Sequence, residues 1–186
     1  MMMKRRLFSV IYFLLSIAMS AQTLSEQEMI QKMAAAAKEI KSVQCDFTQT
    51  RYMKLLKREQ VSQGRMSCQP PGKLRWEYTS PRASTIVLGD ETAVHQNKLA
   101  GEMARMMMKL VAGQSLTDSK NFRVSAEEKP TEYVATLVPL RKDLKRLYTS
   151  LVLHFDIRQY TVTRVEMFEK NGDRTVIELQ NIRIDK

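Results

Sequence analysis

The chain has 186 residues and a formal net charge of +10, with 44% hydrophobic and 27% charged residues. This length suits one domain with a sizeable core. The lack of internal repeats, low-complexity stretches and Pro/Gly-rich linkers excludes a repeat array or a pair of linked domains. The positive charge fits an anionic partner (nucleic acid, anionic lipid or an acidic protein), or it serves general solubility alone.

The first 21 residues have the pattern of a cleavable secretory signal. The pattern consists of basic Lys4, Arg5 and Arg6, an apolar stretch from Leu7 to Met19, and small Ala18, Ser20 and Ala21. The apolar stretch is shorter than the ~20 residues of a spanning helix, which favours cleavage over the alternative, a retained membrane anchor. We predict a signal peptide at residues 1–21 and a single mature domain at residues 22–186.

The predicted cleavage site has no cysteine, the residue to which a bacterial lipoprotein attaches its lipid. Ala21 or Gln22 comes first instead, and no later segment is apolar enough to span a bilayer. We therefore expect an unlipidated, soluble monomer outside the cytoplasm. Export also makes nucleic acid the least suitable of the three anionic partners, so we expect none.

An amphipathic helix is predicted over residues 25–41. Ser25 and Glu28 have the spacing of a capping box, and apolar residues then recur on one helical face. The pattern changes to the alternation typical of strands at Val43–Met53 and Gln60–Cys68, with a turn near residues 55–58. These two strands are predicted to form a hairpin.

Cys45 and Cys68 are the two cysteines of the chain. They would face each other across the predicted hairpin if its register places one opposite the other. An oxidising compartment permits a disulfide between them, and two buried free thiols are the alternative. Both remain open, because a shift of one or two residues in the register separates the pair.

The rest of the chain is predicted to be mostly strand. We expect strands near residues 74–78, 84–88, 92–96, 121–125, 133–138, 149–156, 161–169 and 174–184, and a helix between Gly101 and Gly113. Asn171-Gly172 is a strong hairpin turn. Consecutive antiparallel strands without βαβ crossovers indicate a mainly β meander or barrel. Two helices are the only available cover for the apolar face of such a sheet.

Residues typical of catalysis are sparse. The two histidines, His95 and His154, have no partner at metal-ligand spacing. A nucleophile elbow, a Walker loop and a dinucleotide fingerprint are all missing. We therefore expect no enzyme, no metal and no cofactor, with an exported hydrolase of dispersed site as a remote alternative.

A methionine-rich segment is the unusual chemical feature. Apolar residues at helical spacing are Met103, Met106, Met107, Leu110 and Val111. Methionine is unbranched and polarisable, and it adapts to irregular apolar partners. The segment therefore either lines a pocket for a flexible hydrocarbon or packs an ordinary core. Met108 is predicted on the opposite face, beside Arg105 and Lys109.

The stretch from Ile40 to Val87 resembles the LolA family of periplasmic outer-membrane lipoprotein carriers. The matching blocks are Ile40-Lys41-Ser42, Cys45-Asp46-Phe47-Thr48-Gln49, Gln63-Gly64, Pro71-Gly72-Lys73-Leu74-Arg75-Trp76-Glu77-Tyr78, Ser80-Pro81 and Thr85-Ile86-Val87. The order of elements matches over nearly the whole mature chain. One position departs, because Pro70 stands where family members often carry an arginine that helps to tie the lid.

The resemblance implies a mainly β (α+β) fold, a half-open antiparallel barrel covered by a lid of helices. Such carriers take lipoproteins from an inner-membrane ABC transporter and deliver them to an outer-membrane acceptor. They hold the acyl chains in the apolar cavity, and no bond is made or broken. The implied cavity and lid residues are Phe47, Leu74, Trp76, Tyr78, Met103, Met106, Met107, Leu110, Leu151, Leu153 and Phe155.

A basic cluster lies between two predicted strands. Arg141, Lys142, Lys145 and Arg146 form a candidate docking surface for an anionic membrane or an acidic transporter, with a solvated loop as the alternative. A second functional interpretation is a periplasmic sensor domain of the same fold that detects lipid or mislocalised lipoprotein.

Overall fold

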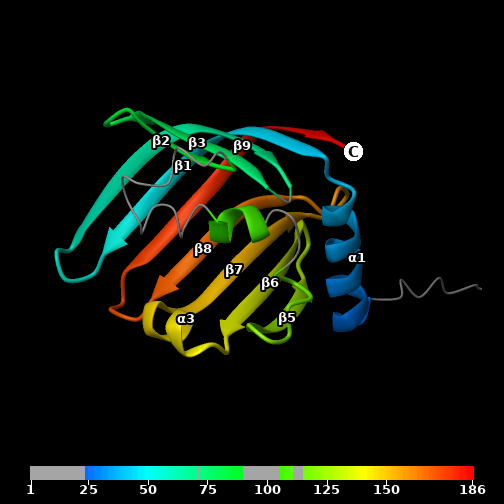
Figure 1. Cartoon of the computed structure of the whole chain (residues 1–186). Helices are drawn as coiled ribbons and strands as arrows, with labels where there is room; N and C mark the ends of the chain where they lie inside the picture. Colours follow the sequence, from blue (N-terminus) through cyan, green and yellow to red (C-terminus); the bar gives the residue numbers. More distant parts are fainter. Residues whose placement is uncertain (1–23, 71, 90–104, 111–114) are drawn as a thin grey trace, which may run out of the picture.

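The computed structural model describes residues 24–70, 72–89, 105–110 and 115–186. Within these ranges nine strands form one antiparallel sheet, in the order β4-β3-β2-β1-β9-β8-β7-β6-β5. The sheet curls without closing on itself (Figure 1). The strands are β1 (Ser42–Met53), β2 (Arg58–Gln69), β3 (Lys73–Ser80), β4 (Ser84–Leu88), β5 (Phe122–Glu128), β6 (Glu132–Pro139), β7 (Tyr148–Asp156), β8 (Val162–Glu169) and β9 (Arg174–Asp185).

Helical segments accompany this sheet: α1 (Glu26–Lys38), α3 (Lys142–Leu147) and a helical stretch of which residues 105–110 are described. In Figure 1 the segment at 105–110 lies within the curl of the sheet, and α1 runs beside the β5–β6 edge. None of the helices in the described ranges has the length and apolarity needed to cross a membrane.

The capping box predicted for α1 is confirmed. The Glu28 backbone N–H donates to Ser25 Oγ at 3.3 Å, and the Ser25 backbone N–H donates to Glu28 Oε2 at 2.9 Å. The helix ends at Lys38 rather than residue 41. The reason is that the Lys41 N–H already donates to the Asp185 carbonyl at 2.8 Å, which commits the chain to the β1–β9 ladder.

The predicted β1–β2 hairpin is present, but the register that would pair its cysteines is wrong by two residues. Cys68 lies opposite Val43, and Cys45 lies opposite Met66. Both thiols are free and buried. The alternative of two free thiols therefore describes this structure.

The remaining predicted strands that fall in the described ranges are present within a few residues, including the β8–β9 hairpin with Gly172 at φ 88°. The strand predicted at 92–96 and His95 lie outside those ranges, as do Met103 and residues 1–23. One connection differs from expectation. The basic stretch after β6 forms the short helix α3, because its leucines recur at helical spacing among good helix formers.

Alternate residues of the strands divide the sheet into two faces. The inner face carries the apolar core, which includes Phe47 in β1, Trp76 in β3, Leu153 in β7 and Ile177 in β9, all at most 3% exposed. α1 adds Met33, which is fully buried. The interior between the sheet and its helical cover is the region that the resemblance assigns to ligand.

Candidate functional site

An aromatic cluster lies on the inner face where β1, β2 and β3 run side by side. The Phe47 and Trp76 ring centroids are 4.2 Å apart, and the Tyr78 ring meets Phe47 edge-on at 5.4 Å. Gly64 in β2 lies opposite both Phe47 and Tyr78. A Cβ at Gly64 would be 2.5 Å from Phe47 Cζ and 2.0 Å from the Glu77 carbonyl oxygen. Glycine is therefore what allows the Phe47 ring to approach β2 so closely.

The helical segment at 105–110 presses its apolar side chains into the same interior. Met107 is fully buried and Leu110 is 1% exposed. Met106 and Met108 are half-buried and also pack against this core, so Met108, predicted on the opposite helical face, contributes to the interior as well. The described part of this helix therefore contacts apolar side chains with more than one of its faces.

The described members of the predicted site meet in one apolar cluster. They are Phe47, Leu74, Trp76, Tyr78, Met106, Met107, Leu110, Leu151, Leu153 and Phe155. Met103 lies outside the described residues. Sequence reasoning missed other members, such as Met66, Val165 and Ile177. The alternation of apolar residues in β2, β8 and β9 is the signal that would have found them.

A polar groove of about 800 Å³ opens on the inner face at one end of the sheet, and Tyr78 separates it from the apolar cluster. The Tyr78 hydroxyl donates to Gln49 Oε1 at 3.1 Å, and burial raises the pKa of this phenol. Arg58, Ser62 and Arg82 also line the groove. Tyr78 thus places an apolar ring toward the interior and a hydroxyl toward the groove.

The interior also contains the two thiols. Burial raises the pKa of Cys45 to about 12, with Asp46 and Cys68 adding to the shift, and burial raises that of Cys68 to about 11. Both thiols therefore stay protonated at neutral pH, and they contribute apolar surface to the interior rather than nucleophiles.

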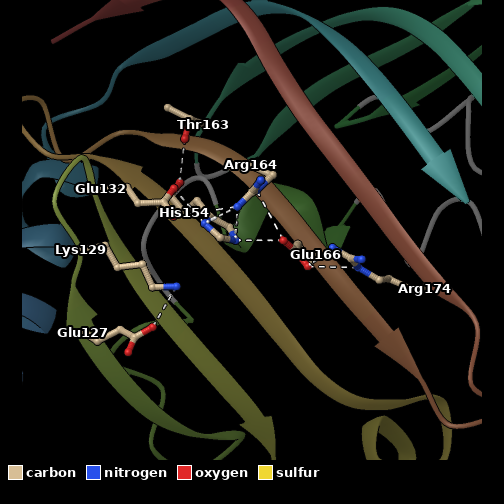
Figure 2. A network of polar contacts seen from close by, with 8 residues as sticks. All are labelled: Glu127, Lys129, Glu132, His154, Thr163, Arg164, Glu166 and Arg174. Atoms are coloured by element: carbon tan, nitrogen blue, oxygen red, sulfur yellow. Dashed lines mark hydrogen bonds and ion pairs between the residues drawn. The ribbon is translucent and has the colours of Figure 1, made fainter. Parts of the chain in front are cut away.

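A charged network lies on the outer face of the sheet (Figure 2). His154 Nδ1 lies 3.0 Å from Glu132 Oε2, and His154 Nε2 lies 3.1 Å from Glu166 Oε1. Arg174 Nη2 donates to Glu166 Oε2 at 2.7 Å, and Arg164 Nη2 lies 2.9 Å from His154 Nδ1. Glu132 lies in β6 and His154 in β7. Arg164 and Glu166 lie in β8, and Arg174 lies in β9. The network therefore ties four strands together.

The network lacks the properties of a catalytic centre. The side chains of His154 and Glu166 are only 5% and 9% exposed, so a substrate has no access to them. The neighbouring hydroxyl of Thr163 donates to the His154 carbonyl at 3.3 Å rather than to the imidazole. In the described ranges no His, Cys, Asp and Glu side chains are grouped to hold a metal ion.

The basic cluster predicted as a docking surface is on and beside α3. Lys142, Lys145 and Arg146 are exposed, and Arg141 pairs with Asp143. The cluster lies away from the apolar interior, so the sequence-predicted residues divide into two sites rather than one.

These features define a class of protein: an open antiparallel half-barrel whose curled face and helical cover enclose an apolar interior. The chain belongs to the LolA family. The family described as outer membrane lipoprotein carrier protein LolA matches residues 38–186. Members of this family are binding or carrier proteins rather than enzymes.

The solved structures to which this chain is similar have little sequence identity to it. MucB has a TM-score of 0.54 at 12% identity, covering 87% of this chain and 59% of MucB. The Pseudomonas aeruginosa MucA/MucB complex has a TM-score of 0.50 at 10% identity, covering 85% and 56%. A LolA superfamily protein from Nitrosomonas europaea has a TM-score of 0.42 at 13% identity, covering 84% and 94%.

The chain thus spans little more than half the length of the MucB chains that it matches. A search of curated protein sequences returned no match.

Proposed function

We propose that the chain is exported by a signal peptide at residues 1–21 and acts in the periplasm as a lipoprotein carrier. It takes lipoproteins from an inner-membrane ABC transporter, shelters their acyl chains in its apolar interior, and delivers them to an outer-membrane acceptor. The observation that carries this proposal is the apolar interior of a LolA-family sheet closed by the methionine-rich segment at 105–110. The role needs binding and release, without catalysis.

The chemistry of the cover supports this role. Burying a methylene group contributes about 0.8 kcal/mol, so acyl chains leave a membrane only for an apolar shelter. Met107 and Leu110 of the segment at 105–110 are buried in the apolar interior, so acyl chains that enter there gain room by displacing this cover. Met106, Met107 and Met108 suit such a cover because methionine repacks at small cost.

The polar groove beside Tyr78 supports an entrance at that end of the interior. An acyl chain has a polar head that remains in water, and a binding site for it needs an apolar interior next to a polar opening. Tyr78 meets both requirements, because its ring packs against Phe47 and its hydroxyl donates to Gln49. We therefore place the acyl chains near Trp76 and the polar head at Arg58 and Arg82.

The proposal is tested by incubating residues 22–186 with lipoprotein-loaded inner membranes, transporter and ATP. The expected result is a soluble complex of one carrier and one lipoprotein. Met107→Glu places a charge at a fully buried position and is expected to abolish release. Lys109→Glu changes an exposed residue of the same segment and is the matched control. If lipoproteins remain membrane-bound with the wild-type protein, the carrier role is wrong.

The single tryptophan of the chain allows the site to be tested separately from release. Trp76 lies in the aromatic cluster and is 3% exposed. A lipopeptide with brominated acyl chains is expected to quench Trp76 fluorescence, because bromine quenches only at short range, and the same peptide without acyl chains is not. Complex formation without quenching would place the acyl chains elsewhere.

A second candidate is a sensor domain that binds lipid or lipoprotein and signals through a protein partner. It is favoured by the likeness in fold to MucB, which has been solved in complex with MucA. A sensor would show the Trp76 quenching but would leave lipoproteins in the membrane. The two measurements together therefore separate a carrier from a sensor.

A further inference from the structure

The turn between β1 and β2 exposes two large aliphatic side chains. Leu55 is 91% exposed and Leu56 is 57% exposed. Both lie beyond Met53 and Arg58, the last residue pair of the β1–β2 ladder. Neither contributes to the core, so the fold gives no reason for two adjacent leucines at this position.

Contacts with the β8–β9 turn hold this tip in place. The Lys54 N–H donates to Asp173 Oδ1 at 3.0 Å, and Arg51 Nη2 donates to Asp173 Oδ2 at 3.3 Å and to Glu169 Oε2 at 3.2 Å. A Cβ at Gly172 would be 2.6 Å from Lys54 Cδ, so the two turns are in contact. The leucines are therefore presented by a braced hairpin.

Basic side chains surround the leucines. Lys54, Lys57 and Arg58 belong to the hairpin itself, and none of the three forms an ion pair with a described residue. The nearby carboxylates of Glu169 and Asp173 are both bound by Arg51, which leaves Glu59 as the acidic neighbour in sequence. The tip thus combines apolar side chains with a net positive charge.

The basic cluster of α3 extends the same rim. The Lys170 N–H, just after β8, donates to the Leu147 carbonyl at the end of α3, at 2.8 Å. Figure 1 shows the β1–β2 tip, the β8–β9 turn and α3 following one another along one end of the sheet. Leu147 is 44% exposed, and Lys145 and Arg146 beside it are exposed and form no ion pair with a described residue.

We propose that this end of the molecule is a lipid-docking surface for anionic bilayers. Leu55 and Leu56 enter the interface between headgroups and acyl chains, and the lysine and arginine side chains around them bind lipid phosphates. Charge complementarity favours a bilayer as the occupant. A protein partner is the weaker choice, because a narrow turn offers little of the ~1,000 Å² that a stable protein interface buries. The proposal goes beyond the carrier function, since it concerns how the protein meets a membrane.

The test is flotation of residues 22–186 with two kinds of vesicle. One contains equimolar phosphatidylethanolamine and phosphatidylglycerol, and the other contains phosphatidylcholine alone. The wild-type protein is expected to float with the anionic vesicles, to bind the neutral ones weakly, and to be released by salt. The variants Leu55→Ser/Leu56→Ser and Lys54→Gln/Lys57→Gln, which both leave the groove residue Arg58 unchanged, are each expected to bind at least about tenfold more weakly.

Val61→Ser is the matched control, because Val61 is also an exposed aliphatic residue of β2, at 49%, but lies away from the tip. It is expected to bind like the wild type. The proposal is overturned if the wild-type protein ignores anionic vesicles, if salt has no effect, or if the double leucine variant binds unchanged. Trp76 quenching by brominated lipopeptide is expected to survive in the leucine variant, so failure of docking and failure of the carrier function remain distinguishable.

Discussion

Single residues set the shape of the interior. Gly64 shows this most directly, because the Phe47 ring and the Glu77 carbonyl occupy the space that any side chain at this position would need. The two cysteines show it differently. Both thiols are free and buried in the sheet, although the predicted signal peptide implies an oxidising compartment. Their burial, which keeps them protonated, therefore sets their reactivity.

Gly64→Ala is expected to destabilise the protein by about 1–3 kcal/mol, because overpacking shifts Phe47 or the backbone of β3. Urea unfolding followed by circular dichroism measures the free energy of unfolding. Gly72→Ala is the matched control, since a Cβ at Gly72 meets no atom within 4 Å. Equal stability of the two variants would contradict the close packing of Phe47 on β2.

The thiols are expected to react slowly with iodoacetamide in the native protein. Thiolate is the reactive form, and burial raises the pKa of Cys45 to about 12 and that of Cys68 to about 11. Denaturant is expected to restore fast alkylation of both, as measured by mass spectrometry. Rapid labelling of the native chain, or a mass lower by two protons, would contradict two buried free thiols.

The same pKa values predict how stability depends on pH. In the unfolded chain both thiols ionise near their ordinary pKa of about 8.5, whereas in the folded chain they stay protonated to higher pH. The unfolded state therefore binds fewer protons in alkaline solution, and the thiols are expected to lower stability as pH rises from about 8.5 toward the folded values. Their contribution is constant below that range, and a Cys45→Ala/Cys68→Ala variant is expected to lose this part of the alkaline decline.

At the scale of elements, the sheet is held together differently on its two faces. Apolar packing holds the inner face, and the network around His154 and Glu166 links β6 to β9 on the outer face. Such a network stabilises only while every member is satisfied, because an unpaired buried charge is costly.

Glu166→Gln is expected to cost about 1–3 kcal/mol of stability, since it weakens charge-assisted bonds to Arg174 and His154 at a buried position. Urea unfolding measures the change. Glu178→Gln, at an exposed position of β9, is the control and is expected to stay within about 0.5 kcal/mol of the wild type. If the two variants are equally stable, the network does not hold the outer face.

At the scale of the whole molecule, the sheet brings together strands from the two halves of the chain. β1 pairs with β9, so the first and last strands lie side by side in the middle of the sheet. This pairing places Phe47 beside Leu179 and continues the interior from β3 across to β7. The binding and docking surfaces proposed here are parts of this one sheet, on its inner face and at one of its ends.

The sequence by itself determined most of the strands, the start of α1 and the alternation of faces along the strands. The capping box of α1, the turn at Asn171-Gly172 and the alternation in β3 depend on neighbours a few residues away, and these were predictable. The motif from Pro71 to Tyr78 is also enough to indicate the family.

Only the tertiary structure decided the strand registers and which side chains are neighbours across the sheet. Cys45 lies opposite Met66, and a bulge between Gln44 and Asp46 shifts the β1–β9 ladder. The network of His154 and the contact of the β1–β2 tip with the β8–β9 turn were equally unforeseen. The physical reason is that alternation says which face a side chain occupies, whereas its partner depends on the fit of whole strands that are far apart in the chain.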